Sequence, residues 1–553
     1  MIVMDDLKKD ERTPDIEAPK KLPQPLSSSK AAVPETSEKI RTSAWITLAI
    51  LGCTVLITMY GETMLLPAIR DIIRDFDISY TTSSWILTAY LISGAVSTPI
   101  VGKLSDIYGR KKMVVIILII YIIGISAGGV STNISFLLVA RVIQGIGISM
   151  FPIAFGIIRD QLPKEKLAIG VGVFSSMFAA GSVVGLAVGG SIIQSLGWHA
   201  TFLSIIPVAI SLWIIINRFI HGDNRRAELV EEEGNLVQAD ADTEFSRAHA
   251  NLGEVVTHSN GMRSLDVKGA ITLAITIASF LLTLTYIGNS SSSSNINAYP
   301  TQIIVVSLAL LSMGSLVLFV IIERRAASPL IELSLMTHKI LLPANLLILI
   351  FGITMLMVYQ TTPILVRSPQ PLGFGGDAVA SATVTLPFMI VILVFAPSSG
   401  FIVSKIGNLK PTVAGTIIMT VGFFSLFMFH STEFMVAINL AIVAAGISLI
   451  QVGAFNITME YTPLRFSGVS LGMSVVLVLI GSSIGPAIAA IYMQTHQEIA
   501  KGVGSGSFPS PVSYNLIFLT AALISVISVS IAMILKRRMT QSSMKKSEME
   551  ASN

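Results

Sequence analysis

The chain has 553 residues, of which 52% are hydrophobic and 13% charged, and its formal net charge is +4. A soluble protein normally carries about a quarter charged residues, so the composition excludes an ordinary water-soluble globular protein. Charged residues concentrate in 1–43, 217–267 and 536–553, with long apolar runs between them. Because a helix needs about 20 apolar residues to cross a bilayer core of about 30 Å, these runs indicate a polytopic membrane protein.

Apolar runs bounded by charges, Gly, Pro or Asn predict fourteen transmembrane helices. In chain order they cover 44–67, 81–102, 113–130, 135–158, 167–193, 198–217, 268–288, 302–322, 340–365, 379–402, 411–429, 434–458, 467–493 and 513–535. The predicted organisation is an N-terminal tail (1–43), an N-terminal six-helix half (44–217), a linker (218–267), two additional transmembrane helices (268–322), a C-terminal six-helix half (323–535) and a C-terminal tail (536–553). The acidic linker has few apolar residues and is expected to be flexible.

Charge in the short loops predicts the orientation. An even number of spans places both termini on one side. That side carries Lys103, Arg110, Lys111, Lys112, Arg159, Lys164, Lys166, Arg324, Arg325, Lys339, Lys405, Lys410 and Arg465, whereas the other side carries only Arg70, Arg74, Arg367 and Lys501. Because basic loops stay in the cytoplasm, we predict a plasma-membrane protein with both termini cytoplasmic. This topology explains the positive charge without a nucleic-acid partner.

An internal repeat predicts the architecture. Three patterns recur 298 to 300 residues apart: Pro99 and Gly102 match Pro397 and Gly400, Gly147-Ile148-Ser149 matches Gly446-Ile447-Ser448, and Gly181 with Gly185 matches Gly481 with Gly485. Parallel repeats form transporters whose substrate site lies near the midplane between the halves. We expect an all-α membrane fold of two six-helix halves, with two further helices between them.

Four motifs resemble those of a known family. Gly102 to Lys112 (GKLSDIYGRKK) resembles the signature loop between helices 2 and 3 of the major facilitator superfamily, and Arg141 to Gly147 resembles its helix-4 motif. Gly181 to Gly190 resembles the helix-5 motif associated with antiporters, and Leu265 to Ala270 resembles the entry to helix 7 in the fourteen-helix branch. Together they resemble that branch, the drug:proton antiporters, over roughly residues 50–535.

Two positions depart from the family pattern. Leu186 stands where the antiporter motif usually has proline, and Thr58 stands where the branch commonly has an aspartate in helix 1. Glu62 lies four residues after Thr58, on the same helix face. We interpret it as a relocated carboxylate.

Glu62 and Arg141 are the candidate proton-coupling residues. They are the only Asp, Glu, Lys or Arg residues well inside a predicted span, and a charge at that depth is costly unless it is paired or hydrated. Both lie about 8–9 Å below the outer end of their helices at 1.5 Å per residue, so they could pair. The alternative is an ion pair that only fixes helix packing.

Two sets of residues are candidates for gating and packing. The resemblance implies that Gly102, Asp106, Gly109 and Arg110 form a cytoplasmic loop that latches the two halves, with Asp106 facing a helix terminus or Arg110; the alternative is a simple orientation signal. Gly181, Gly185, Gly189 and Gly190 leave a smooth stripe that lets helices approach closely. The resemblance adds that this packing limits leak in an antiporter.

Polar and aromatic residues in the spans are candidates for the substrate cavity. They are Tyr60, Tyr90, Gln144, Tyr359, Gln360 and Asn456. Each could instead make a hydrogen bond between helices.

The sequence favours a proton-coupled exporter of amphipathic or cationic small molecules that works by alternating access. No phosphate-binding loop or metal-ligand spacing is present, so we expect no cofactor, no metal and no enzymatic activity. The expected partners are the lipid bilayer, protons and a small-molecule substrate, and we expect a monomer. Two alternatives stay open: a proton-independent metabolite facilitator or exporter, and a transporter-like membrane sensor.

Overall fold

The computed structural model describes residues 42–65, 68–78, 80–163, 166–220, 266–290, 298–326, 329–331, 333–463, 466–499 and 507–552. Residues 1–41 of the predicted N-terminal tail and most of the predicted linker lie outside this part of the chain. Within it, fourteen helical segments are long and apolar enough to cross a membrane. This number agrees with the prediction.

The membrane-spanning helices follow in chain order. They are α1 (Thr42–Thr63), α3 (Tyr80–Tyr108), α4 (Arg110–Gly129), a composite of α5 (Ile134–Gly145), the 3-10 turn η1 (Ile146–Ser149) and α6 (Met150–Gln161), then α7 (Leu167–Leu196), α8 (His199–Phe219), α11 (Val267–Ser290), α12 (Ala298–Arg325), α14 (Leu341–Arg367), α15 (Ala378–Ile406), α16 (Leu409–Met428), α17 (Glu433–Tyr461), α18 (Ser467–Thr495) and α19 (Pro511–Ser552).

Four smaller elements lie in the connections. The short helices are α2 (Ile69–Phe76) and α13 (Leu333–Thr337), and β1 (Gln497–Ile499) pairs with β2 (Ser507–Pro509) as an antiparallel hairpin. The hydropathy pattern does not reveal α2, because its charged residues interrupt the apolar run. At the C-terminus, α19 continues through residues 536–552, which the sequence analysis assigned to a tail.

Polar caps mark where three helices begin. Asn133 Oδ1 accepts a 2.9 Å hydrogen bond from the Phe136 amide, Asp377 Oδ1 accepts one of 2.8 Å from Ala380, and Thr432 Oγ1 accepts one of 3.3 Å from Met435. Such caps satisfy backbone N–H groups that have no partner in the first turn. They define the entries of α5, α15 and α17.

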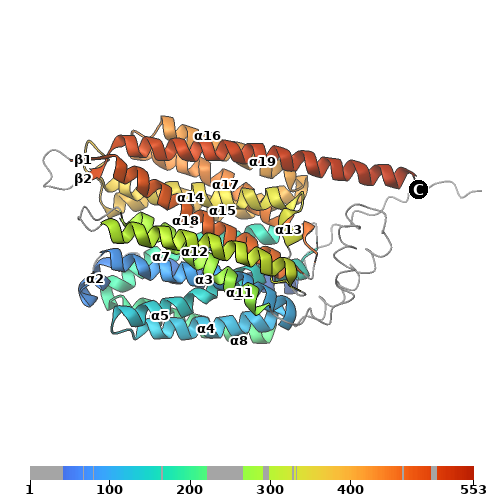
Figure 1. The fold of residues 1–553 in the computed structure, drawn as a ribbon, viewed down its shortest axis with the longest axis horizontal. Helices are drawn as coiled ribbons and strands as arrows, with labels where there is room; N and C mark the ends of the chain where they lie inside the picture. The colour runs from blue at the N-terminus through green and yellow to red at the C-terminus, as the bar shows by residue number, and fades with distance from the viewer. Residues whose placement is uncertain are drawn as a thin grey trace, which may run out of the picture. The chain divides into compact units, whose positions relative to one another are not determined.

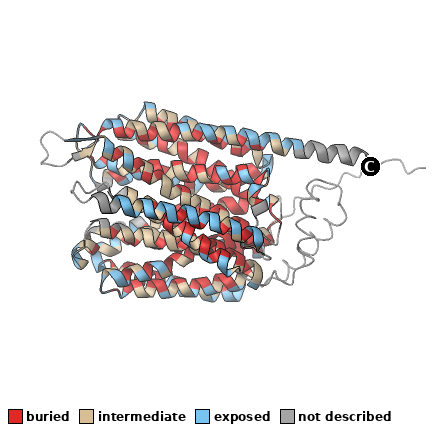
Figure 2. Ribbon diagram, in the orientation of Figure 1, coloured by how far each residue is buried: buried red, intermediate tan, exposed pale blue. Residues whose placement is uncertain are grey.

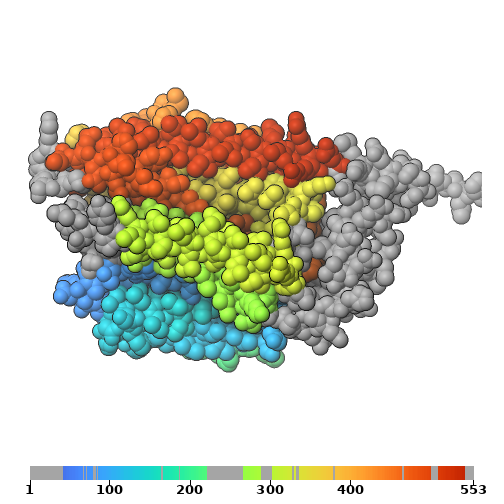
Figure 3. All heavy atoms as spheres, viewed as in Figure 1, coloured from blue at the N-terminus to red at the C-terminus, as the bar shows by residue number. Residues whose placement is uncertain are grey.

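Within residues 40–553 the helices lie side by side, and α11 bridges the two halves. It packs on α3 of the N-terminal half and α18 of the C-terminal half, while α12 packs on α11. Figure 1 shows this pair, in yellow-green, crossing between the blue N-terminal helices and the orange-red C-terminal helices. The outward side of α12 is largely exposed (Figure 2), and its atoms form part of the surface in Figure 3.

The two halves meet along two seams that the internal repeat relates to each other. One seam joins α3 to α18, and the other joins α15 to α7. A Cβ added to Gly102 would lie 2.7 Å from the Gly468 carbonyl oxygen, and one added to Gly400 would meet the Ala168 carbonyl oxygen. Because Gly102 and Gly400 are repeat equivalents, the same backbone contact closes both seams.

The turns that follow α3 and α15 also have the same backbone conformation. Gly109 has φ 93° between α3 and α4, and its equivalent Gly407 has φ 81° between α15 and α16. Residues with a Cβ rarely adopt this conformation. We call the side of the molecule that carries these two turns the basic face, because its short loops carry most of the lysines and arginines.

We predict that Gly400→Val lowers the thermal unfolding midpoint of the purified protein. A Cβ at this position meets the Ala168 carbonyl oxygen and lies 2.9 Å from the Ile169 Cα, and overpacking of this kind costs about 1–3 kcal/mol. The control is Gly314→Val on α12, where a Cβ meets nothing within 4 Å. Equal losses in the two variants would show that backbone contact at the seam is not what matters.

Candidate functional site

A cavity of about 460 Å³ lies between the two halves. Its polar wall consists of Glu62, Ser83, Thr88, Arg141, Thr285, Gln360, Thr361, Ser482 and Ser483. Its other wall residues are Leu65, Ile69, Ile86, Leu87, Leu91, Ile92, Leu281, Leu284, Ile364, Pro486, Ala487, Ala489, Ala490 and Met493. A mostly apolar pocket with a few polar groups is typical of small-molecule sites.

The cavity occupies the part of the bundle away from the basic face. Its lining residues come from the end of α1 and the start of α2, the first half of α3, Arg141 of α5, the last turns of α11 and α14, and the second half of α18. The glycine contacts of the two seams lie at the other ends of these helices or of their neighbours. The cavity is therefore closed toward the basic face.

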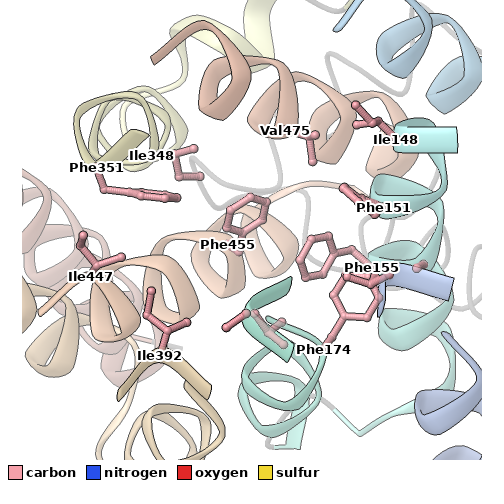
Figure 4. Close-up of a cluster of buried hydrophobic side chains, with 14 of the residues drawn as sticks. Ile148, Phe151, Phe155, Phe174, Ile348, Phe351, Ile392, Ile447, Phe455 and Val475 are labelled. Atoms are coloured by element: carbon pink, nitrogen blue, oxygen red, sulfur yellow. The ribbon is translucent and has the colours of Figure 1, made fainter. Parts of the chain in front are cut away.

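A cluster of buried aromatic side chains reinforces this closure. Phe155 on α6 stacks on Phe455 on α17, with ring centroids 4.9 Å apart and an interplanar angle of 21°. The two residues are 300 positions apart and are repeat equivalents. Phe174 on α7 packs edge-on against Phe155, with ring centroids 4.6 Å apart. Figure 4 shows these rings among Phe151, Phe351 and Val475, where they form an apolar plug between the halves.

Arg141 is fully buried, and its charge is held by groups on neighbouring helices. Its Nε donates to the Ile86 carbonyl at 3.1 Å, and its Nη1 donates to the Gly61 carbonyl and to Gln144 Oε1, both at 2.8 Å. Its guanidinium carbon lies 4.4 Å from the centroid of the Tyr90 ring, close enough for a cation–π contact. These partners fix the guanidinium in one place.

Glu62 lines the same cavity at the end of α1. The similar depth of Glu62 and Arg141 in their predicted helices suggests an ion pair. Among the described residues, Glu62 forms no direct salt bridge with Arg141. The reason is local: Gly61 lies in the last turn of α1, where carbonyl groups lack helical partners, and Arg141 binds that carbonyl instead. The carboxylate is thus left facing the cavity, near a positive charge that is already hydrogen-bonded.

Side chains from three helices hold the end of α1 that carries Glu62. Tyr121 on α4 donates to the Ile57 carbonyl at 2.8 Å, and Tyr90 on α3 donates to the Thr58 carbonyl at 3.2 Å. Together with the Arg141 bond to Gly61, these contacts come from α3, α4 and α5. They position Glu62 through the backbone of its own helix.

At the basic face, Asp106 connects the halves across the α3–α18 seam. Its carboxylate accepts hydrogen bonds from the backbone amides of Gly468 at 3.3 Å and Val469 at 3.2 Å, in the first turn of α18. A carboxylate at a helix N-terminus is favoured by the helix dipole. Of the two partners considered for Asp106 from the sequence, the structure shows the helix terminus.

Arg110 is fully buried beside this contact. Its guanidinium donates to Asp160, to the Gly156 carbonyl and to Ser467 Oγ at the start of α18. Asp106 and Arg110 thus both bind the N-terminal turn of α18 from the other half. We call this pair of contacts the latch.

A family model described as the Major Facilitator Superfamily matches residues 51–486. The chain belongs to the major facilitator superfamily. This is a family of multi-pass membrane transporters rather than enzymes, and the family resemblance seen in the motifs is confirmed.

Relatives of this chain include drug-resistance proteins. The chain is 26% identical to Multidrug resistance protein 3 of Bacillus subtilis (strain 168), over 64% of this chain and 60% of that protein. It is 24% identical to the Tetracenomycin C resistance and export protein of Streptomyces glaucescens, over 82% of this chain and 77% of that protein. The match thus covers less than two thirds of the first of these relatives.

Two solved structures confirm the predicted fold. The human organic anion transporter MFSD10 (TETRAN) matches with a TM-score of 0.60 and 11% identity, covering 88% of this chain and 99% of that one. The proton:xylose symporter XylE, solved with 6-bromo-6-deoxy-D-glucose, matches with a TM-score of 0.57 and 12% identity, covering 88% and 95%. At these identities the likeness concerns the fold alone.

Of the six residues that the sequence offers as candidates for the substrate cavity, Gln360 lines the cavity between the halves. Tyr90 and Gln144 instead support Arg141. Tyr60 Oη lies 3.1 Å from Ser204 Oγ, and the Tyr359 and Phe388 ring centroids are 5.4 Å apart. Asn456 Nδ2 donates to Asn408 Oδ1 at 2.6 Å near the basic face. These contacts match the alternative interpretation, hydrogen bonding and packing between helices.

Sequence reasoning missed the contribution of α11 to the cavity. Leu281, Leu284 and Thr285 line the wall from one of the two additional helices. Trp85 on α3 packs edge-on against Tyr286 of the same helix, with ring centroids 5.6 Å apart. No signal marks these positions, because leucine and threonine are ordinary residues in a membrane span.

The glycine stripe of α7 faces α1. A Cβ on Gly181 would lie 2.5 Å from the Leu56 carbonyl oxygen, and one on Gly189 would lie 3.1 Å from the Met64 Cα. A Cβ on Gly185 would meet Thr63, the residue after Glu62. Gly190 is half-buried on the next helix position, and the Leu186 side chain lies outside the described residues. The stripe packs the helix that carries Glu62.

We predict that Arg141→Met lowers the thermal unfolding midpoint strongly. The substitution removes three hydrogen bonds, and each buried polar group left without a partner costs about 1–3 kcal/mol. The control is Arg218→Met at the exposed end of α8, for which we expect little change. If the two variants melt alike, the Arg141 network does not stabilise this site.

Proposed function

We propose that this protein is a proton-coupled exporter of amphipathic small molecules, including cationic ones, in the plasma membrane. The observation that carries the proposal is Glu62: it is the one carboxylate among the residues that line the cavity between the halves. An ionisable residue at this depth is a functional candidate by default. Arg141 is the only other ionisable residue of the wall.

The closed basic face indicates which way the cavity opens. Basic loops stay on the cytoplasmic side, so both termini and the latch belong in the cytoplasm and the cavity faces outward. In this state a proton from outside can reach Glu62 as substrate departs. In the opposite state, loss of that proton leaves a carboxylate that attracts a cationic substrate.

The fixed charge of Arg141 makes this exchange reversible. Its donors are taken by backbone carbonyls and Gln144, so it does not permanently neutralise Glu62 through a direct salt bridge. The carboxylate can therefore hold a proton or a substrate cation in turn.

The size and surface of the cavity fit substrates of this class. Leucine, isoleucine and alanine side chains form most of the wall, and hydroxyl groups of serine and threonine are scattered among them. Relatives named for multidrug resistance and for tetracenomycin C resistance and export agree with a drug-sized cargo. Each proton charge that crosses the membrane supplies about 2.3 kcal/mol per 100 mV of membrane potential. This energy can drive export of the substrate against its concentration gradient.

We predict that Glu62→Gln abolishes pH-gradient-dependent ethidium uptake into inside-out vesicles while the protein remains folded. The amide keeps the size of the side chain but cannot exchange a proton. The control is Glu433→Gln, a carboxylate at the start of α17 that does not line the cavity, which should retain uptake.

The same assay separates the alternatives. Uptake that ignores both the gradient and the Glu62 substitution would refute proton coupling and favour a facilitator. Absence of transport for any cationic dye would refute the proposed substrate class and direct the search to metabolites.

We also predict that Leu284→Trp raises the half-saturating concentration of bulky dyes about tenfold, which corresponds to about 1.4 kcal/mol of binding free energy. The larger ring narrows the cavity from the α11 side. The control is Leu310→Trp on α12, whose side chain is 68% exposed. Equal transport kinetics in the two variants would exclude α11 from the substrate wall.

A further inference from the structure

Three ionisable residues meet at the basic face, apart from both the cavity and the latch. Glu323 lies in the last turn of α12 and is 3% exposed, Lys103 lies on α3 and is 6% exposed, and Asp266 directly precedes α11. Asp266 belongs to the helix-entry motif noted in the sequence, to which the proposed transport mechanism gives no role. Buried charges of this kind require a specific explanation.

One oxygen of each carboxylate has a backbone partner. Glu323 Oε1 accepts from the Ile331 amide, and Asp266 Oδ1 accepts from the Gly269 amide at 2.9 Å. Lys103 Nζ donates to the Pro329 carbonyl at 2.9 Å. The residues 329–331, here called the connector, are thus held from both sides, by α12 and by α3.

The remaining two oxygens converge on one small space. Glu323 Oε2 and Asp266 Oδ2 are both buried, and neither accepts a hydrogen bond from a described residue. Each lies 2.7 Å from the point where a Cβ on Gly269 would stand. The missing side chain of Gly269 therefore leaves a space that both carboxylate oxygens border.

Among the described residues nearby, the charges do not balance without a further positive charge, and Arg263, like Glu332, lies outside this part of the chain. Lys103 supplies one ammonium group for two carboxylates. Lys268, Arg324 and Arg325 are exposed to solvent, and α18 (Ser467–Thr495) contains no Asp, Glu, Lys, Arg or His. Asp106, one turn after Lys103, is held at the α18 N-terminus. Two facing carboxylates cannot both stay ionised without a large cost.

We propose that Glu323 and Asp266 share one proton across the space above Gly269, forming a second proton-binding site at the basic face. With that proton the cluster holds one ammonium, one carboxylate and one neutral acid, so its net charge is zero. The protonated carboxyl donates to the oxygen that otherwise has no partner. This site is independent of Glu62 and stands whether or not transport is coupled to protons.

The position of this site couples its protonation to the packing of the α3–α18 seam. Leu330 and Ile331 of the connector are 1% and 2% exposed and belong to an apolar cluster with Ala95 of α3 and Val469 of α18. Loss of the proton sets the two carboxylates against each other, and their repulsion displaces the Glu323 side chain from the position in which it holds Ile331. Deprotonation therefore loosens the connector and favours opening of the seam.

The test is infrared difference spectroscopy of the full-length protein in lipid nanodiscs, titrated with pH. All samples carry Glu62→Gln, which removes the cavity carboxyl from the spectrum. We expect a carboxylic-acid carbonyl band that vanishes as pH rises and that is lost in both Glu323→Gln and Asp266→Asn. The Glu433→Gln control should keep it.

A third variant tests the space above Gly269 while both carboxyl groups are kept. Gly269→Ala keeps both carboxyls but places a methyl group between them, so we expect loss of the shared-proton band there too. Survival of the band in Glu323→Gln and Asp266→Asn would overturn the proposal, as would its absence from the parent. Loss of the band on adding Na⁺ at constant pH would also overturn it, by showing a cation site. Because no step requires transport, a negative ethidium result leaves this test unaffected.

Discussion

Close backbone contact at glycine is the constraint on which this structure depends. Lipid supplies little hydrophobic force between helices, so association relies on surfaces that let backbones approach. Gly102 meets Gly468 on one seam and Gly172 meets Gly400 on the other. Because both contacts lie toward the basic face, the halves close there and leave the cavity at the opposite end. The position of the site thus follows from where the glycines lie.

The repeat gives the two seams the same packing but different chemistry. Arg110 and Asp160 form a buried ion pair, whereas their equivalents Asn408 and Glu460 are linked by a neutral donor to a carboxylate. The equivalent of Asp106 is Ser404, which donates to a carbonyl of its own helix. The latch, α11 and the Glu323 cluster all lie at the α3–α18 seam. The proton site proposed at the basic face therefore borders this seam and not the α7–α15 seam.

Hydropathy predicts the fourteen spans because every membrane helix must satisfy its own backbone in lipid. Residue type alone does not predict the cavity wall: Gln360 faces it, but Asn456 does not, and the difference depends on helix rotation and partners. Glu323 was missed for a definite reason. The predicted span ends at 322, whereas α12 continues to Arg325, which places this carboxylate within the helix and against α3 and α11.

The two carboxylate sites suggest how opposite compartments could act on one equilibrium. A proton shifts a conformational equilibrium only if it binds the two states differently. In the proposed mechanism Glu62 meets this condition, because the cavity that it lines is present while the basic face is closed. Glu323 meets it because its partner Ile331 belongs to a connector packed on the closed seam. A proton from outside would then accompany opening on that side, and loss of a proton inside would favour opening toward the cytoplasm. No continuous proton path through the bundle is needed for such coupling.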